Sequence, residues 1–326
     1  MLDDRQTALV ALGRALRASG YRFVTPTPET HRRVLERAPR PGPEDGSTSP
    51  QLLRDVFGWS RPFARSLLPD ELRILCDAAG ILTPVADGPL LKSRVRFSTL
   101  EAPDGHHLFV HSAYPTTAED AVFFGPDSYR FASALLRTVR SARRLVDVGC
   151  GTGVGGLVLA DRAAEVVLAD VSARALDFAA VNRALASSPL RPDRVSLCRS
   201  DVLAEVTGDF DVIVSNPPYL VGPEMTDGGR LYRDGGGPLG LDLAIRIASQ
   251  ALERLVPGGR LILYTGVPII EGRNVLADRL EPQLRAAASR WQWEELDPDV
   301  FGDELERPCY RTTERLAAVL LTAQAT

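Results

Sequence analysis

The stretch that decides the fold is Val146-Asp147-Val148-Gly149-Cys150-Gly151-Thr152-Gly153, a short apolar run that leads directly into a glycine-rich turn. Glycines at this point let the backbone approach a bound cofactor closely, because a Cβ on Gly149 or Gly151 would collide with it. In open α/β sheets, ligands bind outside the carboxyl ends of the strands. The stretch therefore predicts a strand followed by a cofactor-binding turn.

Further apolar runs follow at intervals that leave room for a helix between most of them. Such runs are typical of strands that are buried on both faces of a parallel sheet. The predicted strands are Leu145–Val148, Val166–Ala169, Val195–Cys198, Val212–Ser215 and Leu261–Tyr264, with two more at Trp291–Leu296 and Leu316–Thr322. The expected fold class is α/β, with a mostly parallel, Rossmann-like sheet.

A second motif, Asn216-Pro217-Pro218-Tyr219, stands at the end of the fourth predicted strand. Proline fixes φ and restricts the residue before it, so the carbonyl groups of this turn are held in fixed directions. Asn216 adds an amide, and Tyr219 adds an aromatic face on which a flat molecule could stack. Asparagine and proline are also ordinary turn residues, but the position of the motif after a glycine turn favours a functional role.

In this order, the glycine turn and the Asn-Pro-Pro-Tyr motif resemble class I S-adenosylmethionine (SAM)-dependent methyltransferases that act on planar nitrogen. The similarity is to the HemK-like, or methyltransferase small, group of protein glutamine and nucleobase N-methyltransferases. It covers residues 120–326 well and the first third of the chain poorly. It implies a seven-stranded sheet with an antiparallel end, and SAM as cofactor. A dinucleotide cofactor is disfavoured, because a dinucleotide-binding enzyme does not require Asn-Pro-Pro-Tyr after the fourth strand.

The cofactor site is expected along the ends of three strands. A carboxylate at the end of the second strand, Asp170, can accept both ribose hydroxyls, as in NAD-binding folds. The resemblance places an acceptor for the adenine amino group after the third strand, and Asp147 is expected to orient the loop or to meet the methionine ammonium. The full set of predicted cofactor residues is Asp147, Gly149, Gly151, Gly153, Asp170, Val171, Asp201, Val202 and Asn216.

The predicted catalytic residues are Asn216, Pro217 and Tyr219. An amide or aromatic amine is a poor nucleophile, because its lone pair is delocalised. Acceptors for its hydrogens stabilise the charge that develops as the methyl group arrives. The side-chain oxygen of Asn216 and the carbonyl of Pro217 can be those acceptors.

Two segments are candidates for substrate contact. Residues 123–131, which include Phe124 and Tyr129, precede the core at the position of a family motif but depart from its Pro-Arg-Pro-Glu-Thr pattern. Residues 222–241 form a glycine-rich stretch after the catalytic motif, with Arg230 and Arg233 among the glycines. A loop in that position is expected to be a mobile substrate loop.

The first part of the chain is expected to form a separate domain over residues 1–115, with the catalytic domain at 116–326. Helical spacing predicts helices near 5–19, 29–37, 51–56 and 69–79, and a change to alternating residues predicts a hairpin at 90–100 and 107–112. A winged helix and a helical substrate-recognition cap with a hairpin both fit this pattern.

Composition restricts the partners. The net charge of −4 supplies no overall field that would attract nucleic acid, although several arginines stand in the first forty residues. The four cysteines and four histidines have no metal-binding spacing, so no metal is expected. No membrane span or signal peptide is apparent, which favours the cytoplasm.

Three kinds of methyl acceptor stay open at this point: a protein glutamine, an exocyclic amine of a nucleobase, and a small nitrogenous metabolite. A different class is a SAM-binding regulatory protein that acts through a winged-helix domain. The Asn-Pro-Pro-Tyr motif favours the enzyme, because a protein that only binds SAM has no use for it.

Overall fold

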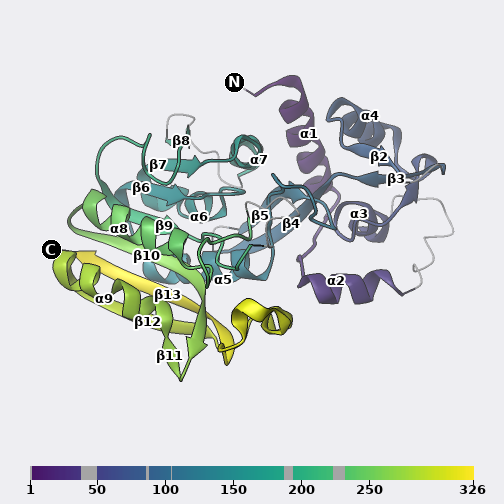
Figure 1. Ribbon diagram of the computed structural model, residues 1–326. Helices are drawn as coiled ribbons and strands as arrows, with labels where there is room; N and C mark the ends of the chain where they lie inside the picture. Colours follow the sequence, from purple (N-terminus) through teal and green to yellow (C-terminus); the bar gives the residue numbers. More distant parts are fainter. Residues whose placement is uncertain (1, 38–49, 86–87, 104, 187–193, 223–231) are drawn as a thin grey trace.

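The computed structural model describes residues 2–37, 50–85, 88–103, 105–186, 194–222 and 232–326. Figure 1 shows a large sheet flanked by helices and, beside it, a smaller group of helices and strands built from the first part of the chain. Over the described ranges, no helix is long and apolar enough to cross a membrane.

The large sheet confirms the predicted fold class. Its strand order is β12-β13-β10-β9-β6-β7-β8, and the neighbours from β10 to β8 run parallel, whereas β13 runs antiparallel to both β10 and β12. The bounds are β6 Ala142–Val148, β7 Ala163–Asp170, β8 Val195–Arg199, β9 Phe210–Ser215, β10 Leu255–Ile270, β12 Ala288–Asp297 and β13 Arg315–Ala325, with the short β11 Arg273–Asn274 paired to β10.

Helices cover both faces of this sheet. Alternate strand residues point to opposite faces, and the two resulting apolar clusters take different helices. One cluster holds residues of α5 (Pro126–Thr138) and α6 (Val154–Val158), and the other holds those of α8 (Asp242–Arg254) and α9 (Val275–Ala287). The chain thus forms a three-layer α/β domain whose cofactor-binding edge lies at the carboxyl ends of β6, β7 and β9.

The first part of the chain contains the expected helices and hairpin. The helices are α1 Asp4–Ala18, α2 Pro28–Leu35, α3 Pro50–Phe57 and α4 Asp70–Ala78, and the strands are β1 Phe63–Ala64, β2 Leu82–Pro84, β3 Leu90–Ser93, β4 Val95–Ala102 and β5 Gly105–Ser112. Local sequence explains the ends of α1. Asp3 and Gln6 form a reciprocal capping box at its start, and Gly20 (φ 69°) lies just past its end.

The structure corrects the first strand of the predicted hairpin. The expected continuous strand over 90–100 is interrupted at Arg94, and its two parts join different sheets. β3 pairs with β1 and β2, whereas β4 pairs with β5. The Ser93 hydroxyl donates to the carbonyl of Val95 (2.7 Å), and this local bond competes with ladder pairing at the break.

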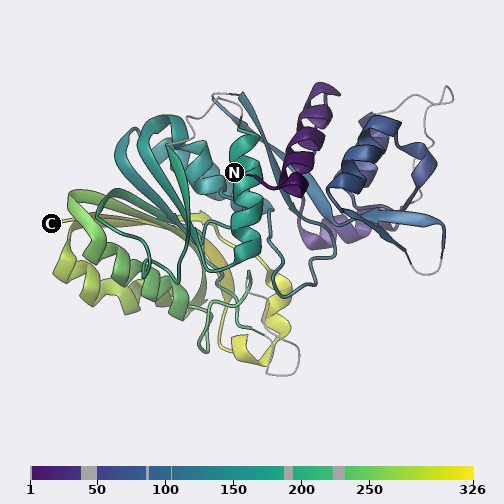
Figure 2. The same cartoon turned by 90° about the horizontal axis from the view of Figure 1, so that it is seen from above.

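Helices α1 and α7 (Ala173–Ala184) lie side by side (Figures 1 and 2). The hairpin β4–β5 packs against both of them. A buried amide on α7, Asn182, joins the hairpin to the glycine turn. Its Oδ1 accepts from the Val110 amide (2.7 Å), and its Nδ2 donates to the carbonyls of Val110 (3.1 Å) and Thr152 (3.0 Å).

Apolar packing also crosses the predicted boundary at residue 115. Phe178, Val181 and Leu185 on α7 belong to the same buried cluster as the side chains of α1, α3 and α4. A protein cut near residue 115 would expose this surface, so point substitutions are better tests of the first domain's role than truncation.

Candidate active site

One cavity of about 410 Å³ lies at the carboxyl ends of β6, β7 and β9, between the catalytic sheet and the first part of the chain. The glycine turn and the end of β7 line one side of it, and we call this side the cofactor half. Residues of α2, β4 and the segment after β5 line the other side, which we call the acceptor half. Residues 216–220, which follow β9, also line the cavity and link the two halves.

The cofactor half begins with the glycine turn. Gly149 (φ 65°) and Gly151 (φ 54°) adopt left-handed backbone conformations that L side chains rarely adopt. A Cβ built on Gly149 would meet nothing within 4 Å, and one on Gly151 would meet only Val122 at 3.9 Å. Both missing Cβ positions therefore face open space, which a cofactor lying against the backbone could fill.

Asp170 closes this half of the cavity. Its side chain is held by the backbone amides of Gly151 (2.8 Å to Oδ2) and Ser172 (2.9 Å to Oδ1). Burial raises the pKa of this carboxyl, and these amides partly oppose the rise. Over the described ranges Asp170 has no ion-pair partner. Each of its oxygens can still accept another bond, as the two hydroxyls of a ribose require.

Two predicted cofactor residues, Asp147 and Gly153, support the turn from below and do not line the cavity. Asp147 is almost fully buried, and its Oδ2 accepts from the Gly156 amide (2.8 Å). Burial raises its pKa to about 7. A Cβ on Gly153 would meet Leu168 at 3.1 Å, so this glycine serves helix–sheet packing. Of the two roles expected for Asp147, the geometry matches orientation of the loop.

Three further predicted cofactor residues, Val171, Asp201 and Val202, are also absent from the cavity lining. Asp201 forms a two-pronged ion pair with the exposed Arg246 (2.7 and 2.9 Å), which engages both carboxylate oxygens outside the cavity. Val202 is buried in the core, while Val171 is 50% exposed beside Asp170. The structure thus does not bring the predicted adenine acceptor to the cavity.

Asn216 lies where the two halves meet. The Ser215 hydroxyl donates to the Val148 carbonyl (2.7 Å), which ties the end of β9 to the end of β6 beside the glycine turn. The next residue, Asn216, is half-buried and lines the cavity together with Pro217. Its side-chain amide makes no hydrogen bond to any other described residue, so it is available to a ligand.

Tyr219 also lines the cavity, but its hydroxyl is already engaged. It donates to Oδ2 of Asp127 (2.6 Å), whose Oδ1 accepts from Tyr264 (2.7 Å). The ring packs so closely on Gly266 that a Cβ there would come within 2.2 Å of it. Burial raises the pKa of Tyr219 well above its ordinary value. The neutral phenol therefore anchors the Asn-Pro-Pro-Tyr turn, and its packing leaves the ring little freedom to move.

Most of the acceptor half was missed by the sequence analysis. Its residues come from segments far apart in the chain, and each segment has an ordinary composition. The lining residues on this side are Thr25, Pro26, Pro28, His31, Arg96, Tyr114, Pro115, Thr116, Thr117, Phe123, Tyr232, Arg233 and Phe301. Arg96 lies within a strand predicted from the sequence, but its burial is evident only in the structure.

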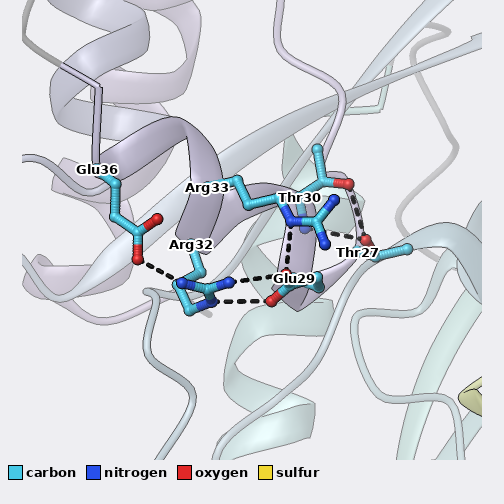
Figure 3. Close-up of polar contacts among 6 residues, drawn as sticks. All are labelled: Thr27, Glu29, Thr30, Arg32, Arg33 and Glu36. Carbon is cyan, nitrogen blue, oxygen red and sulfur yellow. Dashed lines mark hydrogen bonds and ion pairs between the residues drawn. The ribbon is translucent and has the colours of Figure 1, made fainter. Parts of the chain in front are cut away.

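The helix α2 presents Pro28 and His31 to this wall and its charged side chains to solvent. His31 is 1% exposed and lines the cavity, whereas Arg32 and Arg33 lie on the exposed side. Figure 3 shows that both arginines bond to Glu29, and that Arg32 also reaches Glu36. The arginines of α2 are thus neutralised locally and do not form a basic patch.

The substrate-lining prediction for Phe124 and Tyr129 is wrong. Phe124 is fully buried, stacked on Phe109, and absent from the cavity lining. The Tyr129 hydroxyl accepts from the Thr25 amide (3.0 Å), so this ring holds the N-terminal segment in place without reaching the cavity. The neighbouring Phe123 does line it.

The glycine-rich stretch 222–241 lies partly outside the described residues, and Arg230 is among those outside. Arg233 lines the cavity but is paired with Glu304. Tyr232 stacks on Phe123 (5.7 Å between ring centroids), and its hydroxyl donates to the Thr116 carbonyl (2.9 Å). The described end of this stretch therefore contributes directly to the acceptor half. Within the described ranges, no group of acidic, histidine or cysteine side chains could hold a metal.

Comparison with known protein families identifies the central part of the chain. Residues 117–269 match the family model described as the methyltransferase small domain. The matched part of the chain is therefore similar to a methyltransferase small domain. The match confirms the class I methyltransferase fold expected from the sequence, and with it SAM as the cofactor of this domain. The matched region contains the glycine turn, Asp170 and the Asn-Pro-Pro-Tyr motif.

Several characterised proteins are similar to the same region. A release factor glutamine methyltransferase from Deinococcus radiodurans is 38% identical over 170 residues, which are 49% of this chain and 55% of that protein. A tRNA1(Val) (adenine(37)-N6)-methyltransferase from Tolumonas auensis is 36% identical over 143 residues, covering 43% and 57%. A ribosomal RNA small subunit methyltransferase C from Chromohalobacter salexigens is 37% identical over 123 residues, covering 38% and 31%. The chain thus spans about half the length of the first two relatives, and less of the third.

Proposed function

We propose that this protein is a SAM-dependent N-methyltransferase that acts on a planar nitrogen, either an amide or the exocyclic amine of a flat ring. The observation that carries the proposal is the side chain of Asn216, which has no hydrogen bond to another described residue and lines the cavity between its cofactor and acceptor halves. The relatives named above act on a glutamine amide or on bases of RNA. Their acceptors share a nitrogen whose lone pair is delocalised.

The residues of the cofactor half fit SAM. The open backbone at Gly149 and Gly151 accepts the body of the cofactor, and the buried carboxylate of Asp170 accepts two hydroxyl groups. The cofactor supplies an electrophilic methyl group on a sulfonium. SAM carries no phosphate, so this half needs no cation, and among the described residues Asp170 faces none.

The chain's own residues then act on the acceptor. The Asn216 side-chain oxygen accepts one hydrogen of the acceptor nitrogen, and the Pro217 carbonyl accepts the other. Both bonds strengthen as positive charge develops on the nitrogen, so they stabilise the transition state more than the ground state. The hydrogen bond from Tyr219 to Asp127 holds the turn in place, so that these acceptors need not be reoriented during the reaction.

The first part of the chain is proposed to recognise the acceptor, because α2, β4 and the segment after β5 form the acceptor half. Side chains of both parts of the chain form one buried apolar cluster. This packing holds the acceptor half of the cavity rigidly against Asn216 and Pro217. This arrangement supports an enzyme over a SAM-binding regulator, since a regulator does not need a second ligand to reach Asn216.

Methyl transfer from radiolabelled SAM to acceptors in a cell extract tests the proposal. Asn216→Ala should lower kcat by about 10²–10³, comparable to the loss of one preorganised hydrogen-bonding group. The affinity for SAM, measured by calorimetry, should change little. Asn216→Asp keeps an acceptor oxygen at the same place, so it should retain more activity than the alanine variant. Near wild-type rates in both variants would contradict the proposed role of Asn216.

A further inference from the structure

A single arginine, Arg96 on β4, brings a positive charge into the acceptor half of the cavity. The residue is only 2% exposed, and it lines the cavity. Strand alternation places it on the face of β4 opposite to its neighbours Val95 and Phe97, which belong to the buried apolar cluster. Arginine is almost never buried in this way unless a partner of opposite charge meets it.

Among the described residues, Arg96 has no such partner. Its Nε donates to the Ser112 carbonyl at 3.3 Å, and its Nη1 lies 3.4 Å from Nδ1 of His31. Both bonds are long, and the Nη2 amine has no bond to a described residue. The polar groups that influence its charge most are the hydroxyls of Tyr21, Tyr129, Tyr114 and Tyr232, and no carboxylate is among them. Burial without a counter-charge lowers the pKa of Arg96 to about 10.

His31 does not compete for the role of counter-charge. Its Nε2 lies 2.9 Å from the Trp59 carbonyl and must donate to it, because a carbonyl oxygen can only accept. Burial lowers the pKa of His31 to about 4, so the ring is neutral at pH 7 and its Nδ1 accepts from Arg96. The histidine thus orients the guanidinium without neutralising it.

The other charged groups on the cavity wall are already engaged. Asp127 binds Tyr219, Tyr264 and Arg130, and Asp170 belongs to the cofactor half. Arg233 is paired with Glu304. Arg96 is therefore the cationic group on the acceptor side that has unused donors and no carboxylate among the described residues.

We propose that Arg96 binds a carboxylate of the methyl acceptor while Asn216 holds its nitrogen. The proposal rests on the proposed function, and it specifies the acceptor as a compact anionic molecule. A carboxylate carries one negative charge, which matches the one guanidinium on this wall that has no carboxylate partner among the described residues. Its two oxygens can accept the N–H groups of Arg96 that are not yet hydrogen-bonded. A phosphate monoester would bring a second charge, and no described residue on this wall offers a second unpaired cation to meet it. The net charge of −4 also disfavours a long polyanion.

Direct binding of a small carboxylate tests the site without any knowledge of the true acceptor. The probe is benzoate, because the Phe123 and Tyr232 rings of the wall suit a flat body. It is titrated calorimetrically into the full chain, with saturating S-adenosylhomocysteine and with chloride replacing benzoate in a reference titration. The variants are Arg96→Met and the matched control Arg94→Met, an exposed arginine two residues away that does not line the cavity.

Benzoate should bind saturably to the wild type and to Arg94→Met, and at least about tenfold more weakly to Arg96→Met. Arg96→Met should keep or raise the Tm, because it removes a buried charge that has no partner. A lower Tm with unchanged benzoate affinity would assign Arg96 to structure and overturn the proposal. Tighter Arg96-dependent binding of inorganic phosphate than of benzoate would overturn the carboxylate assignment.

The two proposals fail in distinguishable ways. If S-adenosylhomocysteine binds and benzoate does not, the anion site is contradicted, while the proposed methyltransferase function is untouched. If S-adenosylhomocysteine itself does not bind to the wild type, the proposed function is the one contradicted.

Discussion

The two halves of the cavity are built by different means. The cofactor half consists of backbone at the ends of adjacent parallel strands, plus the carboxylate of Asp170. The acceptor half consists of side chains from α2, β4, the segment after β5 and residues 232–233, which are distant in sequence. Backbone sites recur wherever the same fold is used, whereas a wall of side chains can change with each substrate. This difference explains why the class of reaction is easier to assign here than the acceptor.

The two halves of the cavity also differ in the sign of their buried charge. The cofactor half presents a buried carboxylate whose pKa is raised, and the acceptor half presents a buried guanidinium whose pKa is lowered. Each group is stabilised in its charged form by the ligand proposed for it. Substitutions that act on one half should therefore leave ligand binding in the other half unchanged.

The largest expected effect concerns Asp170 in the cofactor half. Asp170→Ala should weaken SAM binding by about 1.5–3 kcal/mol, or roughly 10- to 150-fold, through loss of hydrogen bonds to a charged acceptor. Asp201→Ala is the control, since its carboxylate is paired with Arg246 outside the cavity lining. Calorimetry that shows equal losses for both variants would restore Asp201 to the cofactor site and contradict the division described here.

The next effect concerns the link between the halves. Asn182→Ala should lower the free energy of unfolding by about 1–3 kcal/mol, because it leaves the buried amide and carbonyl of Val110 and the Thr152 carbonyl without this partner. Asp177→Ala on the exposed side of the same helix should change it by less than about 0.5 kcal/mol. Denaturant titration measures both, and similar small values would show that the hairpin does not depend on Asn182.

The smallest effect concerns Asp147 below the glycine turn. Burial raises its folded-state pKa to about 7, whereas an unfolded aspartate titrates at about 4. The folded state therefore holds its proton more tightly, and the free energy of unfolding falls as the pH rises through this interval. Asp147→Asn has no such carboxyl proton, so its free energy of unfolding should not fall for this reason. Between pH 5 and pH 8, the free energy of unfolding of the variant should therefore rise relative to that of the wild type by on the order of 2 kcal/mol. A difference that does not vary with pH would contradict the raised pKa.

Much of the catalytic domain could be predicted from the sequence, because buried parallel strands appear in a sequence as short apolar runs. The runs at Val146 and Val212 lie in β6 and β9, which are adjacent in the sheet, as the two motifs require. The glycine turn and Asn216 were predictable for the same reason, since each directly follows such a strand.

The acceptor half could not be predicted, because no local pattern marks a side chain that acts across the fold. Arg96 and His31 meet only after the hairpin packs against α2. Phe124 was misassigned for the complementary reason, because an aromatic residue near a motif packs in the core more often than it lines a site. Asp201 follows its strand as expected, but an exposed arginine on α8 takes both of its oxygens.

The identity of the methylated atom tests the central claim most directly. The full chain is incubated with methyl-labelled SAM and a cell extract, the labelled product is isolated, and the position of the methyl group is determined by mass spectrometry and NMR. The account predicts a methyl group on an amide or exocyclic amine nitrogen, and formation of that product about 10²–10³ times more slowly with Asn216→Ala. A methyl group on oxygen, sulfur or carbon, or the same product from Asn216→Ala at the wild-type rate, would contradict it.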